Sequence, residues 1–281
     1  MGPRRRSSPA VSALTSIAML LVTAGLSSLR AAQLSAPAPA EEVKIPLDPL
    51  PFDVKGYLRR PSGAGPFPGV VLIPACAPFV NFDDRNWGAT LSSWGYVALT
   101  LDIFTAHGVV GRQTCIYPAS PEFADDIYRG VNLLVERKLV DPKHIYLIGF
   151  GRGGTLVFAA VDPNGVIQRA RHKLRAAITF YPPCDEIKGV MAVPTLVLVG
   201  ARDDQGREAC RKMAAGEDDI GISREPSAGA PIELVVLPDA YAGFDIPAFQ
   251  KPADVRGLHI EYNKQAADKS KEVVRQFLQS H

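Results

Sequence analysis

Short apolar runs alternate with helical patterns along most of this chain, and this alternation limits its fold more than any other feature. Six runs lack the polar-apolar alternation of a half-exposed strand, so they fit strands buried on both faces of a parallel sheet. They cover residues 69–74, 96–101, 144–150, 175–181, 194–200 and 232–238. Helical patterns lie between or after them, at residues 85–94, 123–138, 152–160, 207–214 and 262–278.

The order of these elements predicts an α/β fold with a mostly parallel, doubly wound sheet flanked by helices in a single domain. An alternating stretch at residues 52–61 predicts one earlier, antiparallel strand. In sheets of this type, ligands gather beyond the carboxyl ends of the strands. We therefore look for the function in the loops that follow the strands.

The first 32 residues differ from the rest of the chain. Arg4, Arg5 and Arg6 precede an uncharged, Ala/Leu-rich run that ends at Arg30, which is typical of an export signal. A retained membrane anchor is the alternative, because a run of this length can span a bilayer. A Pro/Ala-rich tether follows at residues 33–45, and the folded domain takes residues 46–281. We expect an exported protein, periplasmic or extracellular.

The charge balance excludes one class of partner. The chain has 31 basic and 29 acidic side chains and a net charge of +2, so no basic field recruits nucleic acid. A small molecule or a protein is the expected partner, with no membrane contact unless the leader is retained. No cluster of His, Asp and Glu has metal-ligand spacing, and we expect neither a metal nor a cofactor. No feature of the sequence predicts an oligomeric state.

Four cysteines agree with export. Cys76, Cys115, Cys184 and Cys210 are even in number, and an oxidising compartment lets them pair. Four buried thiols are the alternative, because a free cysteine behaves as a small apolar side chain. Four cysteines allow three pairings, and the residues alone do not select one.

The stretch LIGFGRGG, residues 147–154, is typical of a buried strand that turns sharply into a helix. Gly149, Gly153 and Gly154 leave room around a turn residue with a strained backbone. That turn residue is Gly151, which adopts such a backbone easily but carries neither oxygen nor sulfur. A dinucleotide-binding turn is excluded, because this turn lies in the middle of the strand order and does not follow the first strand.

Six segments follow one another in a distinctive order. They are GVVLIPACAP, RNWGATLSSWGYVALTLDIF, IGFGRGG, PTLVLVGARDD, VVLPDAYAGFD and YNKQAADKSKEVVRQFL. Together they resemble the dienelactone hydrolase family of the α/β-hydrolase superfamily, over nearly everything from Phe52 to Phe277. The resemblance implies the α/β-hydrolase fold and, for the family, hydrolysis of ester or lactone bonds.

The resemblance also assigns the three positions of a catalytic triad, and two of them are changed. The nucleophile position is Gly151, the acid is retained as Asp203, and the histidine position is Ala242. Acyl transfer by this route needs a nucleophile and a base that takes its proton, so both reactive side chains are missing. The exported branch of the family further implies two disulfides, Cys76–Cys115 and Cys184–Cys210.

The loop after the first core strand, residues 74–78, departs from the His-Gly-rich loop of the family. Pro74 and Pro78 remove two backbone donors from a loop that would stabilise a developing negative charge. The start of the helix after Gly151 still offers donors to a carboxylate. The candidate ligand-binding residues are Cys76, Ala77, His107, Arg152 and Gly153.

Three hypotheses follow for the function. The first is a protein that has lost the triad mechanism and binds a small carboxylate or ester-like ligand in the remaining pocket. The second is an active ester or lactone hydrolase that uses Cys76 as a displaced nucleophile, or a water held near Asp203 with His107. The third is a purely structural or interaction role. The other four histidines are most simply surface residues.

Overall fold

The computed structural model describes residue 2 and residues 39–115, 120–185, 187, 189–217, 225, 228–255 and 257–281. The predicted export signal and the first part of the tether lie outside the described residues, apart from Gly2. No helix in the described part of the chain has the length and apolarity that a membrane crossing requires.

Eight strands of the described chain form one sheet, in the order β1-β2-β4-β3-β5-β6-β7-β8. The strands from β3 to β8 are mutually parallel, while β1 pairs antiparallel with β2, and β2 antiparallel with β4. The α/β architecture and the six core strands are confirmed. The strands are β1 (Glu41–Pro46), β2 (Asp53–Arg59), β3 (Phe67–Ile73), β4 (Val97–Asp102), β5 (Val140–Phe150), β6 (Ala176–Phe180), β7 (Thr195–Gly200) and β8 (Ile232–Leu237).

The fold begins earlier than the sequence predicts. The sequence predicts a tether that includes residues 41–45. In the structure these residues belong to β1, which pairs along its whole length with β2. Val43 and Ile45 are buried while their neighbours are exposed, which is the two-residue period of a strand with one face on the core. The Pro/Ala-rich composition around them obscures this short alternation.

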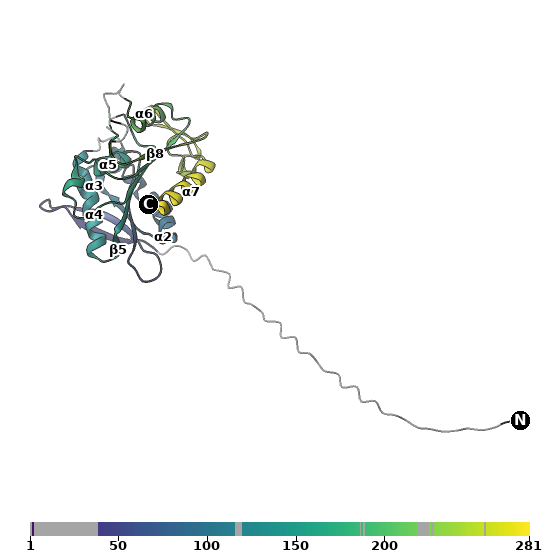
Figure 1. Cartoon of the computed structure of the whole chain (residues 1–281), viewed down its shortest axis with the longest axis horizontal. Helices are drawn as coiled ribbons and strands as arrows, with labels where there is room; N and C mark the ends of the chain where they lie inside the picture. Colours follow the sequence, from purple (N-terminus) through teal and green to yellow (C-terminus); the bar gives the residue numbers. More distant parts are fainter. Residues whose placement is uncertain are drawn as a thin grey trace. The chain divides into compact units, whose positions relative to one another are not determined.

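Helices cover both faces of the sheet (Figure 1). On one face, α4 and α5 pack over a core that includes Ile127, Val131 and Leu156. On the other face, α2 and α7 pack over a second core that includes Trp87, Phe180 and Phe277. The α-helices are α1 (Val80–Asp83), α2 (Ala89–Ser93), α3 (Ile103–Ala106), α4 (Ala124–Glu136), α5 (Arg152–Val161), α6 (Asp204–Ala215) and α7 (Lys264–Ser280).

Three features of this fold lie outside the predicted elements. The helix predicted to start at residue 85 starts at Val80, and its middle, η2 (Asp84–Gly88), is a π-helical turn. Short 3-10 turns flank the loops, at η1 (Ala77–Phe79), η3 (Gly111–Cys115), η4 (Pro121–Phe123), η5 (Val166–Arg169) and η6 (Pro247–Gln250). A small hairpin, β9 (Ala253–Val255) and β10 (Leu258–Ile260), precedes α7.

Candidate functional site

Gly151 forms the turn between β5 and α5. Its φ of 49° and ψ of −116° lie in a region that side chains other than hydrogen rarely occupy. The turn is held by two backbone hydrogen bonds: the Gly151 N–H donates to the Phe180 carbonyl at 2.8 Å, and the Gly154 N–H donates to the Gly151 carbonyl at 2.9 Å. The sharp strand-to-helix turn is therefore present although its central residue carries no reactive group.

The turn packs directly against the end of β3. A Cβ on Gly153 would lie 2.0 Å from the Ile73 carbonyl oxygen, so only glycine fits there. A Cβ on Gly151 would meet only the Ala75 Cβ at 3.3 Å and the Tyr181 ring at 4.0 Å. A small side chain at position 151 would press only on Ala75, whereas Gly153 fixes how closely helix and strand approach.

The loop at residues 74–78 is tied down on the far side of Gly151. Cys76 is buried and forms a disulfide with Cys115, so its sulfur is not available as a nucleophile. The Ala77 N–H donates to the Thr114 hydroxyl at 3.0 Å, which removes a third backbone donor from any negative charge at the turn. The structure places Ala77 in this loop as a half-buried residue already engaged with η3.

Asp203 follows β7 and caps α6. Its carboxylate accepts a hydrogen bond from the Gly206 N–H at 3.1 Å, and its carbonyl accepts one from the Arg207 N–H at 2.8 Å. A carboxylate at this position stabilises the first turn of a helix. Asp203 thus has a structural task that does not depend on a histidine.

Ala242 lies in the segment that follows β8, and it is only 2% exposed. Its carbonyl accepts a hydrogen bond from the Glu261 N–H at 3.1 Å, and it forms an isolated bridge with Ile260 of β10. The Arg202 N–H donates to the Ala240 carbonyl at 2.9 Å. The loops that carry Ala242 and Asp203 therefore lie side by side at the carboxyl edge of the sheet.

Asp245, three residues beyond Ala242, fastens this segment to the core. It is buried, and it accepts hydrogen bonds from the Trp87 indole N–H and from the Tyr181 hydroxyl, both at 2.8 Å. Tyr181 directly follows β6, has a φ of 39° and contributes the ring nearest to Gly151. Burial raises the pKa of Asp245, and the two hydrogen bonds oppose that rise.

Asp83 completes what we name the buried acid cluster, which consists of Asp83, Trp87, Tyr181 and Asp245. It is 1% exposed, and its Oδ2 has no hydrogen-bond partner in the described part of the structure. Burial raises the pKa of Asp83 well above its usual value, and the charge of Asp245 raises it further. Asp83 therefore holds its proton more tightly than Asp245, which has two donors.

The sequence reasoning missed Asp83. Asp83 lies two residues before the helical pattern predicted at residues 85–94, and a helix extended back to Asp83 would place it on the same face as Trp87, four residues on. An aspartate on the same face as a core tryptophan indicates a buried carboxyl group. Burial also raises the pKa of Tyr181, and the nearby charges of Asp245 and Asp83 raise it further.

His107 is engaged on the other side of the sheet. Its Nε2 lies 2.6 Å from Oδ2 of Asp126 in α4, and its ring stacks on Phe123 with centroids 3.9 Å apart. Burial raises the pKa of Asp126, and the contact with His107 opposes that rise. The structure therefore pairs the His107 ring with Asp126 and Phe123.

The second disulfide joins Cys184 and Cys210. Cys184 follows β6, and Cys210 lies in α6, the helix that Asp203 caps. Both pairs are those that the resemblance implies. In the described residues no group of His, Cys, Asp or Glu is arranged to hold a metal ion.

A model of the dienelactone hydrolase family matches residues 54–281. The chain belongs to the dienelactone hydrolase family. Among curated proteins, Lipase 1 of Moraxella sp. (strain TA144) is 26% identical over 153 residues, which are 53% of this chain and 42% of the lipase. The chain thus matches less than half the length of that relative.

Solved structures that are similar to this chain share its fold. A dienelactone hydrolase-like promiscuous phosphotriesterase from metagenomic libraries has a TM-score of 0.62 and 20% identity, and the match covers 86% of this chain and 97% of that one. An esterase from Thermogutta terrifontis, solved with propionate bound, has a TM-score of 0.60 and 19% identity, over 86% of this chain and 94% of that one.

The three residues that the resemblance assigns to the triad positions all fall at the carboxyl edge of the sheet. Gly151 follows β5, Asp203 follows β7 and Ala242 follows β8. Arg152 and Gly153 open α5 beside them, with Arg152 half-buried and Gly153 buried. Gly151 and Ala242, at two of these positions, carry no side-chain group that attacks a substrate or takes a proton.

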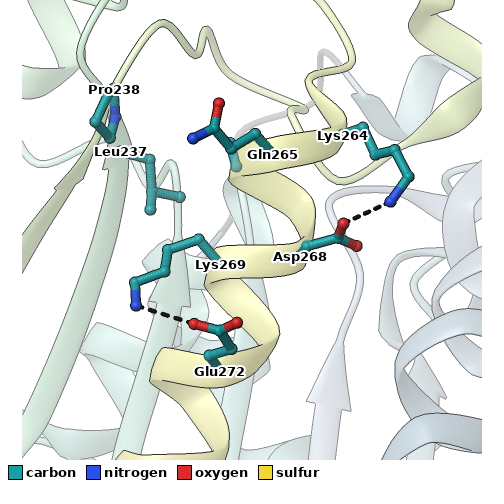
Figure 2. Close-up of a pocket in the computed structure, with 8 residues that line it drawn as sticks. Leu237, Pro238, Lys264, Gln265, Asp268, Lys269 and Glu272 are labelled. Carbon is teal, nitrogen blue, oxygen red and sulfur yellow. Dashed lines mark hydrogen bonds and ion pairs between the residues drawn. The ribbon is translucent and has the colours of Figure 1, made fainter.

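Two hollows lie on the described surface near this edge. The larger, about 660 Å³, lies between the end of β8 and α7 (Figure 2). Its lysines form ion pairs along their own helix, Lys264 with Asp268 and Lys269 with Glu272, so they are not free to recruit an anion. The second, about 520 Å³, is lined by Pro78, Asn81, Phe82, Arg85, Asn86 and Pro247.

Proposed function

We propose that this member of the dienelactone hydrolase family is a non-catalytic binding protein, which takes a small carboxylate or ester-like ligand beside Gly151. The observation that carries the proposal is the combination of an intact turn with two apolar triad positions. Gly151 supplies neither an attacking oxygen nor a sulfur, and Ala242 supplies no base. Cys76 is sealed in a disulfide.

The hydrogen-bond donors at the start of α5 favour an anionic ligand. The first turn of α5 presents backbone N–H groups, and Arg152 stands at its start. A helix N-terminus with a cation favours an anion, because both contribute positive potential. The Thermogutta esterase with bound propionate supports a short carboxylate as the first ligand to try.

Hydrolysis assays test the loss of catalysis. We expect the purified protein to hydrolyse p-nitrophenyl acetate, p-nitrophenyl butyrate and simple lactones no faster than the buffer. An active enzyme would be indicated by turnover that disappears in an Asp203→Ala variant, and that result would reject the proposal.

Thermal unfolding with and without propionate tests binding. A ligand that binds only the folded state raises the melting temperature, with a gain of about 2.7 kcal/mol at a hundred times its Kd. Propionamide, which has nearly the same shape but no charge, should have little effect. Arg152→Gln should remove the propionate effect, while Arg171→Gln, a change of an exposed arginine, should not. No stabilisation by any short carboxylate would favour a structural role.

We further propose that the protein is exported. Two disulfides among the described residues fit an oxidising compartment, and the leader at residues 1–32 has the pattern of an export signal. Expression of the full chain in a bacterium, followed by fractionation and mass measurement of the N-terminus, tests this. A cleaved periplasmic product is expected, whereas an intact, membrane-bound chain would support the anchor.

A further inference from the structure

The run of helix from α1 to α2 is interrupted by the π-helical turn η2, at Asp84–Gly88. A π-turn adds a residue to a helical turn, is rare, and occurs often at functional sites. Here the widened turn buries Asp84 and Trp87, which lie on either side of an exposed Arg85 and a half-buried Asn86. The irregular turn therefore presents an arginine and an amide to the surface.

Both acidic side chains of this run point into the protein. Asp84 forms a buried ion pair with Arg59, with Oδ2 of Asp84 2.7 Å from Nη2 of Arg59. The Arg59 side chain is 9% exposed and the Asp84 side chain 5%. Asp83 belongs to the buried acid cluster. Neither carboxyl group is at the surface beside Arg85. Arg85 makes no hydrogen bond or ion pair with any residue that the structure describes.

A second cation lies behind Asn86. Lys271 of α7 donates a hydrogen bond to Asn86 Oδ1 at 3.2 Å, and its ammonium lies 6.0 Å from the centroid of the Trp87 ring. Because Oδ1 is taken by Lys271, the Asn86 amide has its NH2 group available to another acceptor. This arrangement adds a donor next to Arg85 and increases the local positive potential.

The 520 Å³ hollow is lined by Arg85 and Asn86 together with apolar side chains. Pro78 comes from the end of the 74–78 loop, Phe82 from α1 and Pro247 from the start of η6. Its volume is in the range that small-molecule sites occupy, about 300–1,000 Å³. Unlike the hollow against α7, it contains a cation without an acidic partner among the described residues. We name it the Arg85 groove.

We propose that the Arg85 groove binds a small organic anion with a flat apolar body, of the chemical class of aromatic carboxylates. The guanidinium of Arg85 pairs with the carboxylate through two parallel N–H donors. Asn81 and Asn86 supply further amide donors, and Phe82 packs on the ring between the two prolines. This site stands apart from the proposed function, because neither Gly151 nor Arg152 lines it.

Calorimetric titration with benzoate tests the site, with benzyl alcohol as the uncharged analogue. The wild-type protein should bind benzoate saturably and benzyl alcohol much more weakly. Arg85→Gln should weaken benzoate binding roughly tenfold or more, since a hydrogen-bonded charge pair is lost. Arg171→Gln removes the same charge from an exposed position that precedes β6, at the opposite edge of the sheet, and should leave the affinity unchanged.

Three results would overturn the proposal. They are no saturable benzoate binding up to about 10 mM, equal affinity for benzyl alcohol, and equal benzoate affinity in the Arg85→Gln variant. Arg152→Gln separates this groove from the site beside Gly151, because loss of binding in that variant alone places benzoate at the turn. Perturbation of the Asn86 side-chain amide signal by benzoate, seen by NMR, supplies an independent location. Arg85 is exposed, so its variant should fold normally.

Discussion

The Tyr181 hydroxyl donates a 2.8 Å hydrogen bond to Asp245, and this bond joins the end of β6 to the segment that carries Ala242. The Trp87 indole N–H holds the other oxygen of the same carboxylate. Three separate parts of the chain therefore meet at one buried carboxylate. The position of the Ala242 segment is set by this contact and needs no histidine.

Removing Asp245 should therefore destabilise the fold strongly. Asp245→Ala leaves two buried donors without a partner, and we expect a loss of about 3–5 kcal/mol in the free energy of unfolding. Tyr181→Phe removes a single donor and should cost about 1–3 kcal/mol. Urea unfolding followed by tryptophan fluorescence measures both. Asp254→Ala, at an exposed aspartate of β9, is the matched control and should change stability by less than about 0.5 kcal/mol.

The two acids of the buried cluster should make stability depend on pH. The folded state raises the pKa of Asp83 through burial and through the charge of Asp245. A raised pKa contributes stability that is complete below the unfolded value of about 4 and is lost as the pH rises through the folded value. Asp83→Asn removes this titration. The free-energy difference, wild type minus Asp83→Asn, should therefore fall as the pH rises above about 4.

Urea unfolding at several pH values gives that difference directly. Asp245 also has a raised pKa, so the variant keeps part of the pH dependence. Lys271 and Tyr181 face the same cluster, and the raised pKa of Tyr181 keeps its hydroxyl protonated over this range. Parallel pH curves for the two proteins would mean that the pKa of Asp83 is the same in the folded and the unfolded state, which contradicts the prediction.

The disulfide Cys76–Cys115 should contribute more to stability than Cys184–Cys210. The first closes a stretch with a separation of 39 residues and the second one of 26. Chain-entropy arguments give about 4 and about 3.5 kcal/mol. Replacing each pair by serines and measuring urea unfolding tests both values. An effect near zero for Cys76→Ser with Cys115→Ser would mean that the 74–78 loop is held by its other contacts, such as Ala77 with Thr114.

Under the proposed function, adding a nucleophile at position 151 and a base at position 242 should produce some chemistry. The Cβ of Gly151→Ser would lie 3.3 Å from the Ala75 Cβ, so Ala75 has to shift slightly, and Ala242→His places a base in a loop adjacent to that of Asp203. The double variant should hydrolyse p-nitrophenyl acetate about a hundredfold or more faster than either single variant, since nucleophile and base act as a unit. Adding Asp203→Asn should abolish the gain. A double variant no faster than its parents would mean that the 74–78 loop has closed the pocket.

The sequence predicts the sheet well, because a strand that is buried on both faces appears in the sequence as an unbroken apolar run. The β7 strand, for example, is an unbroken apolar run and is buried throughout. Short strands are harder to predict from the sequence. The strands of β9 and β10 have three residues each, too few for a period, and β1 is hidden in a proline-rich segment.

Side-chain partners distant in sequence were the least predictable part of the site. His107 pairs with Asp126 in a helix whose polar pattern indicates only an exposed face. The π-turn adds one residue to a helical turn. One added residue changes the apolar pattern of the segment too little for the sequence to predict the turn. The disulfide pairs came from the resemblance, because spacing alone leaves three possibilities.

The backbone at position 151 makes the change of its residue easier in one direction than in the other. A side chain held at a φ of 49° carries strain of about 1–3 kcal/mol, while glycine carries almost none. A family member that acquires glycine here keeps its turn and gains folding stability when it gives up the nucleophile. Reversion to serine or cysteine gives up that gain, so it is favoured only when the recovered activity is itself under selection.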